Sequence, residues 1–294
     1  MDQNSIADFP TNWGRWGATD QLGAVNLITA EARARGVAEA RTGKTVSLAR
    51  ESAIASLNAG PASPVELPTA AVHTVMMFTG SPAPAMAEYL MMPSHHRLIT
   101  HLDAMGHFIV DGQVYPGVPQ AESSGPAGVT HGAADVYGNG ILTRGILLDL
   151  APGGRLPDGH PVTAADLTAA ARHANVEPRP GDAIVVRGGW DHAADLHRGL
   201  PGMTAGAVRW MHEQGVSVYA GDIGDAMPPL ADEVPGALHR LGLGRLAIPL
   251  IDGADAEALA GVCAELGRHT FMLVVAIPRI LGTSGLPVNP LAVF

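Results

Sequence analysis

Cysteine is almost absent from this chain of 294 residues, which contains only Cys263. A single thiol cannot form an intrachain disulfide, and it cannot build a cysteine-rich zinc site. A metal ion bound by this chain must therefore be held by histidine, aspartate or glutamate side chains. The sequence offers 13 histidines for that purpose.

Positive charge and long apolar runs are also scarce. The net charge is -10 at pH 7, so the chain lacks the basic surface that nucleic acids or anionic membranes require. The sequence contains no run of about 18 uncharged apolar residues, the length that could span a bilayer. The first thirty residues do not combine a basic segment with an apolar one, as a signal peptide would. We therefore expect a cytoplasmic protein whose partner is a small molecule.

Hydrophobic residues make up 47% of the chain, enough for a sizeable core. Hydrophobic runs predict strands at 45–48, 146–150, 183–187, 216–220, 246–251 and 271–277. Cap residues such as Thr29, Thr163 and Thr204 predict helices at about 31–41, 163–174, 204–215 and 255–266, with a further short helix after Pro235. Proline and small residues dominate 53–87, which predicts a long loop system with one strand at 72–78.

This alternation of strands and helices predicts an α/β fold with its site at the C-terminal ends of strands. No break in composition divides the chain. We therefore expect a single domain spanning 1–294, with an extended N-terminal arm over about 1–45.

The densest chemistry lies between His95 and His107, where four histidines and an aspartate occur within thirteen residues. If 99–103 is extended, the strand period of two places His101 and Asp103 on the same face. An imidazole and a carboxylate so placed can share one cation at about 2.0–2.2 Å. A His-x-Asp pair arises readily by chance, so the cluster is the stronger indication of a metal site. The alternative is a set of ordinary exposed loop histidines.

The stretch Thr100-His101-Leu102-Asp103-Ala104-x-x-His107, continued by Asp111-Gly112-x-x-Tyr115-x-Gly117, resembles the Putative cyclase family of metal-dependent hydrolases. That family includes bacterial kynurenine formamidase and isatin hydrolase. Segments 13–17, 23–29, 143–149, 181–182, 187–190 and 287–290 resemble, in the same order, those of its longer members. The resemblance implies an α/β fold of the swivelling β/β/α type, a mixed β core or barrel flanked by helices. It also implies a homodimer or homotetramer.

The family signature is His-x-Gly-Thr-His-x-Asp-x-Pro-x-His, in which the first two histidines and the aspartate bind metal and the last histidine transfers a proton. Carried over, His101 and Asp103 become metal ligands and His107 becomes the catalytic proton carrier. The first signature position falls on Arg97. Longer members often carry the histidine six positions before the second one, which selects His95 as a ligand, with His96 as the near alternative.

Family members complete the metal shell with a later histidine and an acidic residue about a dozen positions further on. The matching residues here are His239 and Asp252. Taken alone, His239 could equally lie on a helix surface, and Asp252 could be a turn or N-cap residue. Asp222 and Asp225 resemble a family segment near the site, and we expect them to support the ligands or to form a turn.

The resemblance implies a metal-dependent hydrolase that cleaves an amide, lactam or lactone bond in a small cyclic or N-acyl substrate. One or two divalent cations, Zn²⁺ or Mn²⁺, would lower the pKa of a bound water toward about 7 and stabilise the oxyanion. The sequence has no Gly-x-Ser-x-Gly elbow for a serine nucleophile. Two alternatives stay open. One is a metal-assisted cyclase or dehydratase of antibiotic-type biosynthesis; the other, motivated by Arg97, is a metal-free member with a binding role.

Aromatic side chains near these motifs could line an apolar wall around the substrate. We expect substrate contacts from Trp13, Trp16, Phe108 and Tyr115, and we also consider Met91, Met92 and Trp190. Side chains of these kinds are more often simply part of the core.

Overall fold

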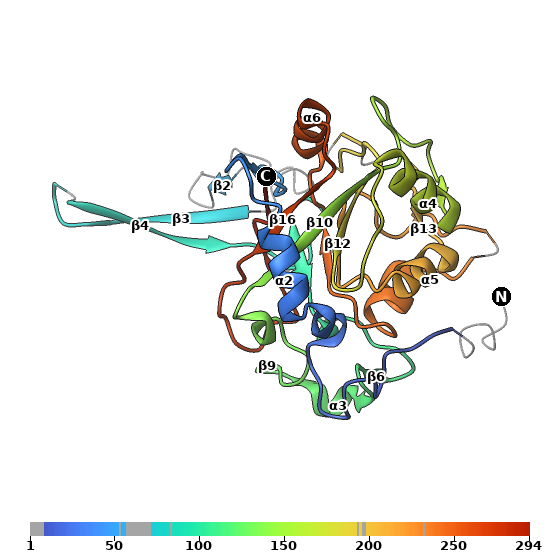
Figure 1. The fold of residues 1–294 in the computed structure, drawn as a ribbon. Helices are drawn as coiled ribbons and strands as arrows, with labels where there is room; N and C mark the ends of the chain where they lie inside the picture. Colours follow the sequence, from blue (N-terminus) through green and yellow to red (C-terminus); the bar gives the residue numbers. More distant parts are fainter. Residues whose placement is uncertain are drawn as a thin grey trace.

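A nine-stranded mixed sheet lies at the centre of the computed structural model (Figure 1), which describes residues 9–52, 54–56, 72–82, 84–192, 194–195, 198–231 and 233–294. In spatial order the strands are β1 (Thr45–Ser47), β18 (Leu291–Val293), β16 (Thr270–Val275), β10 (Ile141–Asp149), β12 (Ala183–Arg187), β14 (Val218–Gly221), β15 (Leu250–Asp252), β5 (His101–Asp103) and β17 (Gly285–Pro287). The four strands β10, β12, β14 and β15 are parallel, and the strands on either side of them pair antiparallel. This mixed sheet with its helices confirms the predicted α/β class.

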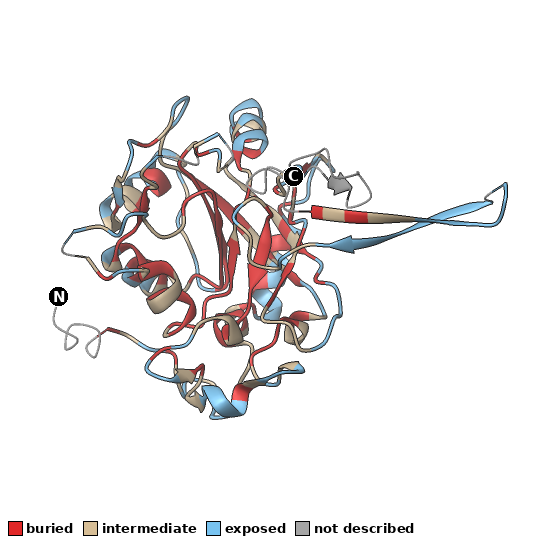
Figure 2. Cartoon of the chain, turned by 180° about the vertical axis from the view of Figure 1, so that it is seen from behind, coloured by how far each residue is buried: buried red, intermediate tan, exposed pale blue. Residues whose placement is uncertain are grey.

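The parallel strands are buried on both faces, as their unbroken apolar runs predict. Every residue of β12 is buried, and the red strands at the centre of Figure 2 show the same burial across the sheet. Helix α2 (Ala30–Val37) packs against β10, whereas α4 (Ala164–His173) packs against β10 and α5 (Ala205–Glu213). In Figure 1, α2 lies on one side of β10 and β12, and α4 and α5 lie on the other.

Capping residues start the helices where the sequence predicts. The Thr163 hydroxyl accepts a hydrogen bond from the Asp166 backbone N–H, and the Asp166 carboxylate accepts one from the Thr163 backbone N–H, which forms a capping box. Thr29 caps α2. The predicted extension of α2 to about residue 41 is wrong: the helix ends at Val37, and the backbone N–H groups of Glu39 and Ala40 form turn hydrogen bonds to the Gly36 and Val37 carbonyls, three residues back.

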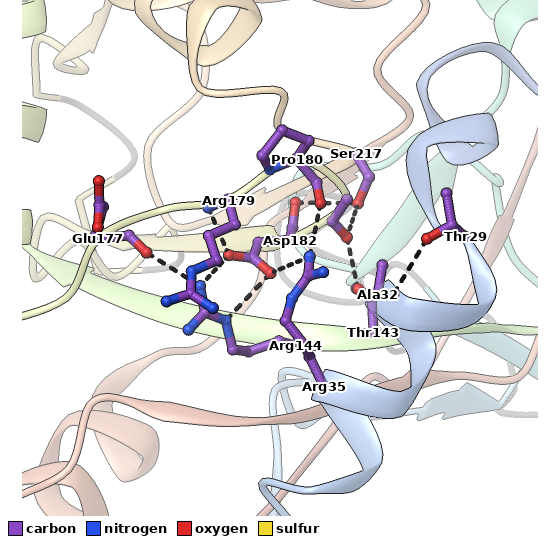
Figure 3. A network of polar contacts seen from close by, with 11 residues as sticks. Thr29, Ala32, Arg35, Thr143, Arg144, Glu177, Arg179, Pro180, Asp182 and Ser217 are labelled. Atoms are coloured by element: carbon purple, nitrogen blue, oxygen red, sulfur yellow. Dashed lines mark hydrogen bonds and ion pairs between the residues drawn. The ribbon is translucent and has the colours of Figure 1, made fainter.

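A buried ionic network joins α2 to the start of β12 (Figure 3). The Asp182 carboxylate accepts hydrogen bonds from the Arg144 side chain and from the Arg179 backbone N–H, and Arg35 of α2 approaches it at 3.5 Å. The Asp182 side chain is only 1% exposed, so each of its oxygens depends on these partners. The network fixes α2 against β10 and the start of β12.

Two strands form an arm that extends away from the body in Figure 1. Strand β3 (Val72–Thr79) pairs antiparallel with β4 (Ala85–Met91), and β3 also pairs with β2 (Ile54–Ser56). All of β4 is exposed, including Met86, Tyr89 and Leu90. The strand predicted at 72–78 is confirmed. The prediction that the rest of 53–87 forms loop missed β2 and the start of β4, and 57–71 lie outside the described residues.

The remaining elements connect these parts. They are η1 (Gly23–Leu27), η2 (Met105–His107), β6 (Gln113–Val114), β7 (Val118–Pro119), α3 (Gln120–Ser123), β8 (Ser124–Gly125), β9 (Gly128–Val129), η3 (Ala134–Tyr137), β11 (Pro161–Val162), β13 (Gly202–Met203), the π-helix η4 (Leu238–Leu243) and α6 (Glu257–Leu266). Among the described helices, none is long and apolar enough to cross a membrane. That the whole chain forms one domain stays a prediction.

Candidate metal centre

Strand β5 places the first part of the site. It is three residues long, lies between β15 and β17, and is entirely buried. Since side chains alternate along a strand, His101 and Asp103 share one face while Leu102 points to the other. Asp252, the last residue of β15, pairs directly with His101. Sheet register therefore brings Asp252 beside the His101 and Asp103 pair from a part of the sequence 149 residues further on.

His95 reaches the same carboxylate from the segment before β5. Its Nδ1 lies 2.5 Å from Asp103 Oδ1, and its Nε2 lies 2.9 Å from the Ser284 hydroxyl. Gly285 makes this position available, because a Cβ at that residue would overlap the His95 ring and the Leu102 carbonyl. The structure thus brings His95 into the cluster, whereas His96 accepts a hydrogen bond from the Leu98 backbone N–H and does not line the cavity.

His239 enters the site on the π-helix η4. Its Nε2 lies 3.2 Å from Asp252 Oδ2 and 3.4 Å from Asp103 Oδ2. On the other side of the ring, Nδ1 lies 2.7 Å from Asp225 Oδ2. The Asp225 carboxylate also accepts the Leu238 backbone N–H at the start of η4. Asp225 thereby fixes the ring orientation and holds the Nδ1 proton, which turns Nε2 toward the cavity.

His107, at the end of η2, stacks on His95 with ring centroids 3.7 Å apart and an interplanar angle of 10°. Its imidazole has no hydrogen bond within the described part of the chain. Burial, together with the nearby histidines, outweighs the attraction of Asp103 and lowers the pKa of His107 to about 4. His107 is therefore a neutral imidazole with its nitrogens available for proton transfer.

The cluster has a strongly negative potential. Burial opposes the charged form of His239, but the carboxylates of Asp252, Asp103 and Asp225 outweigh it and raise the pKa of this imidazole well above its ordinary value. Burial also opposes ionisation of Asp103, yet hydrogen bonds from His239 and His95 hold the pKa of that carboxyl below its usual range. A cation placed among these groups would be stabilised.

These side chains surround a cavity of about 250 Å³. Its lining consists of His95, Arg97, His101, Asp103, His107, His192, Gly221, Ile223, Gly224, His239, Asp252 and Gly253. All six residues predicted as ligands or proton carrier are in that lining, although they come from distant parts of the chain.

The residues present fit a divalent cation. Two sets of potential ligands each have donor atoms within 4.8 Å of one another, and both sets include Asp103. One set is His101, Asp103 and Asp252, and the other is His95, Asp103 and His107. Among the described residues, the buried Asp252 Oδ1 has no hydrogen-bond partner, and the buried Asp103 Oδ2 has none apart from His239 Nε2 at 3.4 Å. Buried charged oxygens without partners are costly, and a bound cation would satisfy them.

The candidate ligand histidines are held from behind, as metal-binding imidazoles commonly are. His101 Nδ1 lies 2.7 Å from the Ile99 carbonyl, which assigns the proton to Nδ1 and leaves Nε2 as the donor atom for a metal. A divalent ion with imidazole and carboxylate ligands suits zinc or manganese. These observations support a metal site.

The predicted aromatic wall is mostly not at this cavity. Phe108 lies close, with its ring 5.9 Å from that of His239. In contrast, Trp13 donates its indole N–H to the Gly244 carbonyl, and Trp16 lies under the Arg15 guanidinium. Tyr115 is fully buried and donates its hydroxyl to Asp20. Trp13 and Trp16 also pack against the core, so of these four predicted side chains Phe108 alone lies beside the site.

The other aromatic and methionine candidates also lie away from the cavity lining. Trp190 is 3% exposed, and the Arg155 guanidinium covers its ring. Met91 ends the exposed strand β4, and Met92 packs against Val72 and Ile99.

Several supporting residues carried no recognisable signal in the sequence. Ser284, Gly285 and His192 belong to no ligand motif, and their roles arise from contacts with residues distant in the chain. Asp222 accepts hydrogen bonds from the backbone N–H groups of Gly188 and Trp190, which places it in a loop-bracing role. Asp225 could be found only through the family resemblance.

An α/β fold that gathers histidines and aspartates around one small cavity defines a candidate metal centre, and comparison with known proteins identifies the family. The model of the Putative cyclase family matches residues 45–226. The chain belongs to this family.

Solved structures agree with that assignment. A crystal structure of a novel cyclase is 31% identical, with a TM-score of 0.81, and the match covers 97% of this chain and 98% of that chain. An isatin hydrolase bound to the product analogue thioisatinate is 18% identical, with a TM-score of 0.58 and coverage of 90% and 98%. Isatin hydrolase A from Labrenzia aggregata, bound to benzyl benzoate, is 16% identical, with a TM-score of 0.57 and coverage of 85% and 93%. The two hydrolases share the fold, which confirms the predicted cyclase-like architecture. No protein among the curated sequences matches the chain.

Proposed function

We propose that this protein is a metal-dependent hydrolase that cleaves an amide, lactam or lactone bond in a small cyclic or N-acyl substrate. The observation that carries the proposal is a pair of buried carboxylate oxygens beside the histidines of one cavity. Among the described residues, Asp252 Oδ1 has no hydrogen-bond partner, and Asp103 Oδ2 has only the His239 imidazole at 3.4 Å. His101, Asp103, Asp252 and His239 would hold a Zn²⁺ or Mn²⁺ ion, with His95 as a further ligand. The shared fold with isatin hydrolases supports hydrolysis as the reaction class.

A divalent cation at this position supplies Lewis acidity, which lowers the pKa of water and polarises a substrate carbonyl. The chain supplies the remaining functions. His107 has no competing hydrogen bond, so its imidazole can accept a proton from the attacking water and return it to the leaving group. Asp225 and the Ile99 carbonyl hold His239 and His101 in their tautomers, and the small cavity limits the size of the acyl group.

His95 favours this proposal over a metal-free binding role. The metal-free alternative rests on Arg97, which stands where the family signature has its first histidine. In the structure, however, the His95 imidazole lies against Asp103, so His95 supplies a histidine to the cluster in place of residue 97.

Metal analysis and isotope labelling test the proposal. The purified protein, equilibrated with Zn²⁺ or Mn²⁺ and then desalted, should retain at least one ion per chain, and His101→Ala should lose it. The loaded protein should then be assayed with isatin, simple lactones and N-formyl anilides in ¹⁸O-labelled water. Hydrolysis places ¹⁸O in the acid product, whereas metal-assisted cyclisation or dehydration would give a product without it. A protein that retains no ion, or turnover without ¹⁸O incorporation, would overturn the assignment.

A further inference from the structure

Arg97 supplies the positive charge of the cavity lining. It is an exposed residue, and its guanidinium has no hydrogen bond or ion pair within the described part of the chain. Its backbone lies beside the turn after β15, where the Arg97 and Ile99 carbonyls approach Gly253. Gly253 directly follows Asp252, so Arg97 lies close in the fold to the metal-site carboxylate without pairing with it.

The charges around the cavity leave Arg97 uncompensated. Asp103 and Asp252 are the two carboxylates in the lining, and together they match the charge of one divalent ion. The nearby carboxylate of Asp225 lies behind His239 and is occupied with the His239 ring and the start of η4. A loaded cavity therefore presents one extra positive charge to the substrate. An anionic group on the substrate would match this charge, and a guanidinium binds a carboxylate with two parallel hydrogen bonds.

His192 adds a second polar group to the same lining. Its Nε2 donates to the Asp222 carbonyl at 2.8 Å, so its Nδ1 carries the lone pair. That Nδ1 atom is buried and has no hydrogen-bond partner among the described residues. Hydrogen bonds hold the loop before His192 in place: the Asp222 carboxylate accepts from the Gly188 and Trp190 backbone N–H groups, and the Arg50 side chain donates to the Trp190 carbonyl. A substrate N–H or O–H donor would satisfy the unpartnered nitrogen.

We propose that Arg97 and His192 form a subsite for a carboxylate-bearing substrate, in which Arg97 binds the carboxylate and His192 accepts a hydrogen bond from an amide N–H. This inference rests on the proposed hydrolase function and narrows its substrate class to small acyl compounds that carry a negative charge beside the scissile bond. The cavity volume of about 250 Å³ limits the substrate to a single ring or a short chain.

Two matched probes test the subsite: N-formylanthranilate, which carries a carboxylate, and formanilide, the same amide without it. In the Mn²⁺-loaded protein we expect a preference of about 10- to 100-fold for the anionic probe in kcat/KM, the range of a charge-assisted hydrogen bond. Arg97→Gln should abolish most of that preference while retaining its metal, and Arg97→Lys should restore part of it. Arg172→Gln, which changes an exposed arginine of α4, is the matched charge control and should preserve the preference.

Calorimetric titration with anthranilate and aniline provides a readout that does not require turnover. Arg97→Gln should weaken anthranilate binding about 10- to 100-fold. His192→Ala should weaken binding of both probes, and His192→Asn, which retains an acceptor, should recover part of the loss. Equal anthranilate affinity in wild type and Arg97→Gln would overturn the subsite, as would loss of metal from Arg97→Gln. Failure of hydrolysis alone would count against the proposed reaction, because the binding data report on Arg97 independently.

Discussion

Replacing Asp225 with asparagine should weaken metal binding although it removes none of the candidate ligands. Asp225 uses one carboxylate oxygen for His239 Nδ1, at 2.7 Å, and the other for the Leu238 backbone N–H, at 2.8 Å. Asparagine keeps one acceptor oxygen and no charge, so one of these two donors loses its partner. The His239 ring then loses both its fixed tautomer and the charge that raises its basicity.

The expected loss of metal affinity follows from the position of Asp225 behind the His239 ring. Losing a carboxylate that orients a metal-binding histidine costs about 10- to 100-fold in metal affinity. This is about 1.4–2.7 kcal/mol of binding free energy. Asp103→Asn, in contrast, changes a fully buried candidate ligand shared by both sets of donor atoms, so it should abolish stoichiometric binding.

Titration with Mn²⁺ measures these effects directly, because the electron paramagnetic resonance signal of free Mn²⁺ falls as the ion binds. The matched control is Asp166→Asn. Asp166 is also a half-buried aspartate that starts a helix, but its partner is Thr163, far from the cavity. It should retain wild-type affinity, and circular dichroism should show all variants folded. If Asp225→Asn binds Mn²⁺ as tightly as wild type, or if Asp166→Asn is equally impaired, the assigned role of Asp225 is wrong.

Three further outcomes are expected. His107→Gln should retain its metal and lose about 10²- to 10⁴-fold in turnover, measured by elemental analysis and initial rates; loss of metal would make His107 a ligand instead. Asp182→Asn should lower the unfolding free energy by about 3 kcal/mol or more in urea denaturation, because it breaks a buried ion pair with Arg144. Burial raises the pKa of Asp222 from 3.8 to about 6, so the folded state binds this proton more tightly than the unfolded chain does. This difference contributes about 3 kcal/mol to the unfolding free energy below about pH 4, and the contribution is lost as pH rises through 6. Urea denaturation at pH 4.5 and 7 should show this pH-dependent component in wild type and not in Asp222→Asn.

Much of the sheet was predictable because its central strands are buried on both faces. The strand at 183–187 matches β12 in full, since its apolar run is bounded by turns and buried throughout. The end of α2 at Val37 was not predicted, because no glycine or proline stands between Val37 and Arg41 to mark the turn that follows the helix. Strand β4 was missed for a related reason. Its residues are all exposed, so no burial pattern marks them, and only pairing with β3 makes them a strand.

The candidate site, like the sheet, could be predicted where local sequence patterns decide it and not where distant contacts do. The strand period alone places His101 and Asp103 on one face, and the structure agrees. His239 and Asp252 came from the family resemblance, since only the pairing of β5 with β15 and the position of η4 bring them near. Nothing in the sequence could single out Gly285, because its importance is the absence of a Cβ beside the His95 ring.

The candidate metal centre therefore depends on the register of β5. A shift of β5 by one residue would turn His101 and Asp103 to the opposite face and bring Leu102 into the cavity. The strand is only three residues long, but it is hydrogen-bonded on both sides, to β15 and to β17. Leu102 is fully buried on the far face, so a slipped register would exchange a packed leucine for a buried charge. Core packing on one face of β5 thus specifies the ligand geometry on the other.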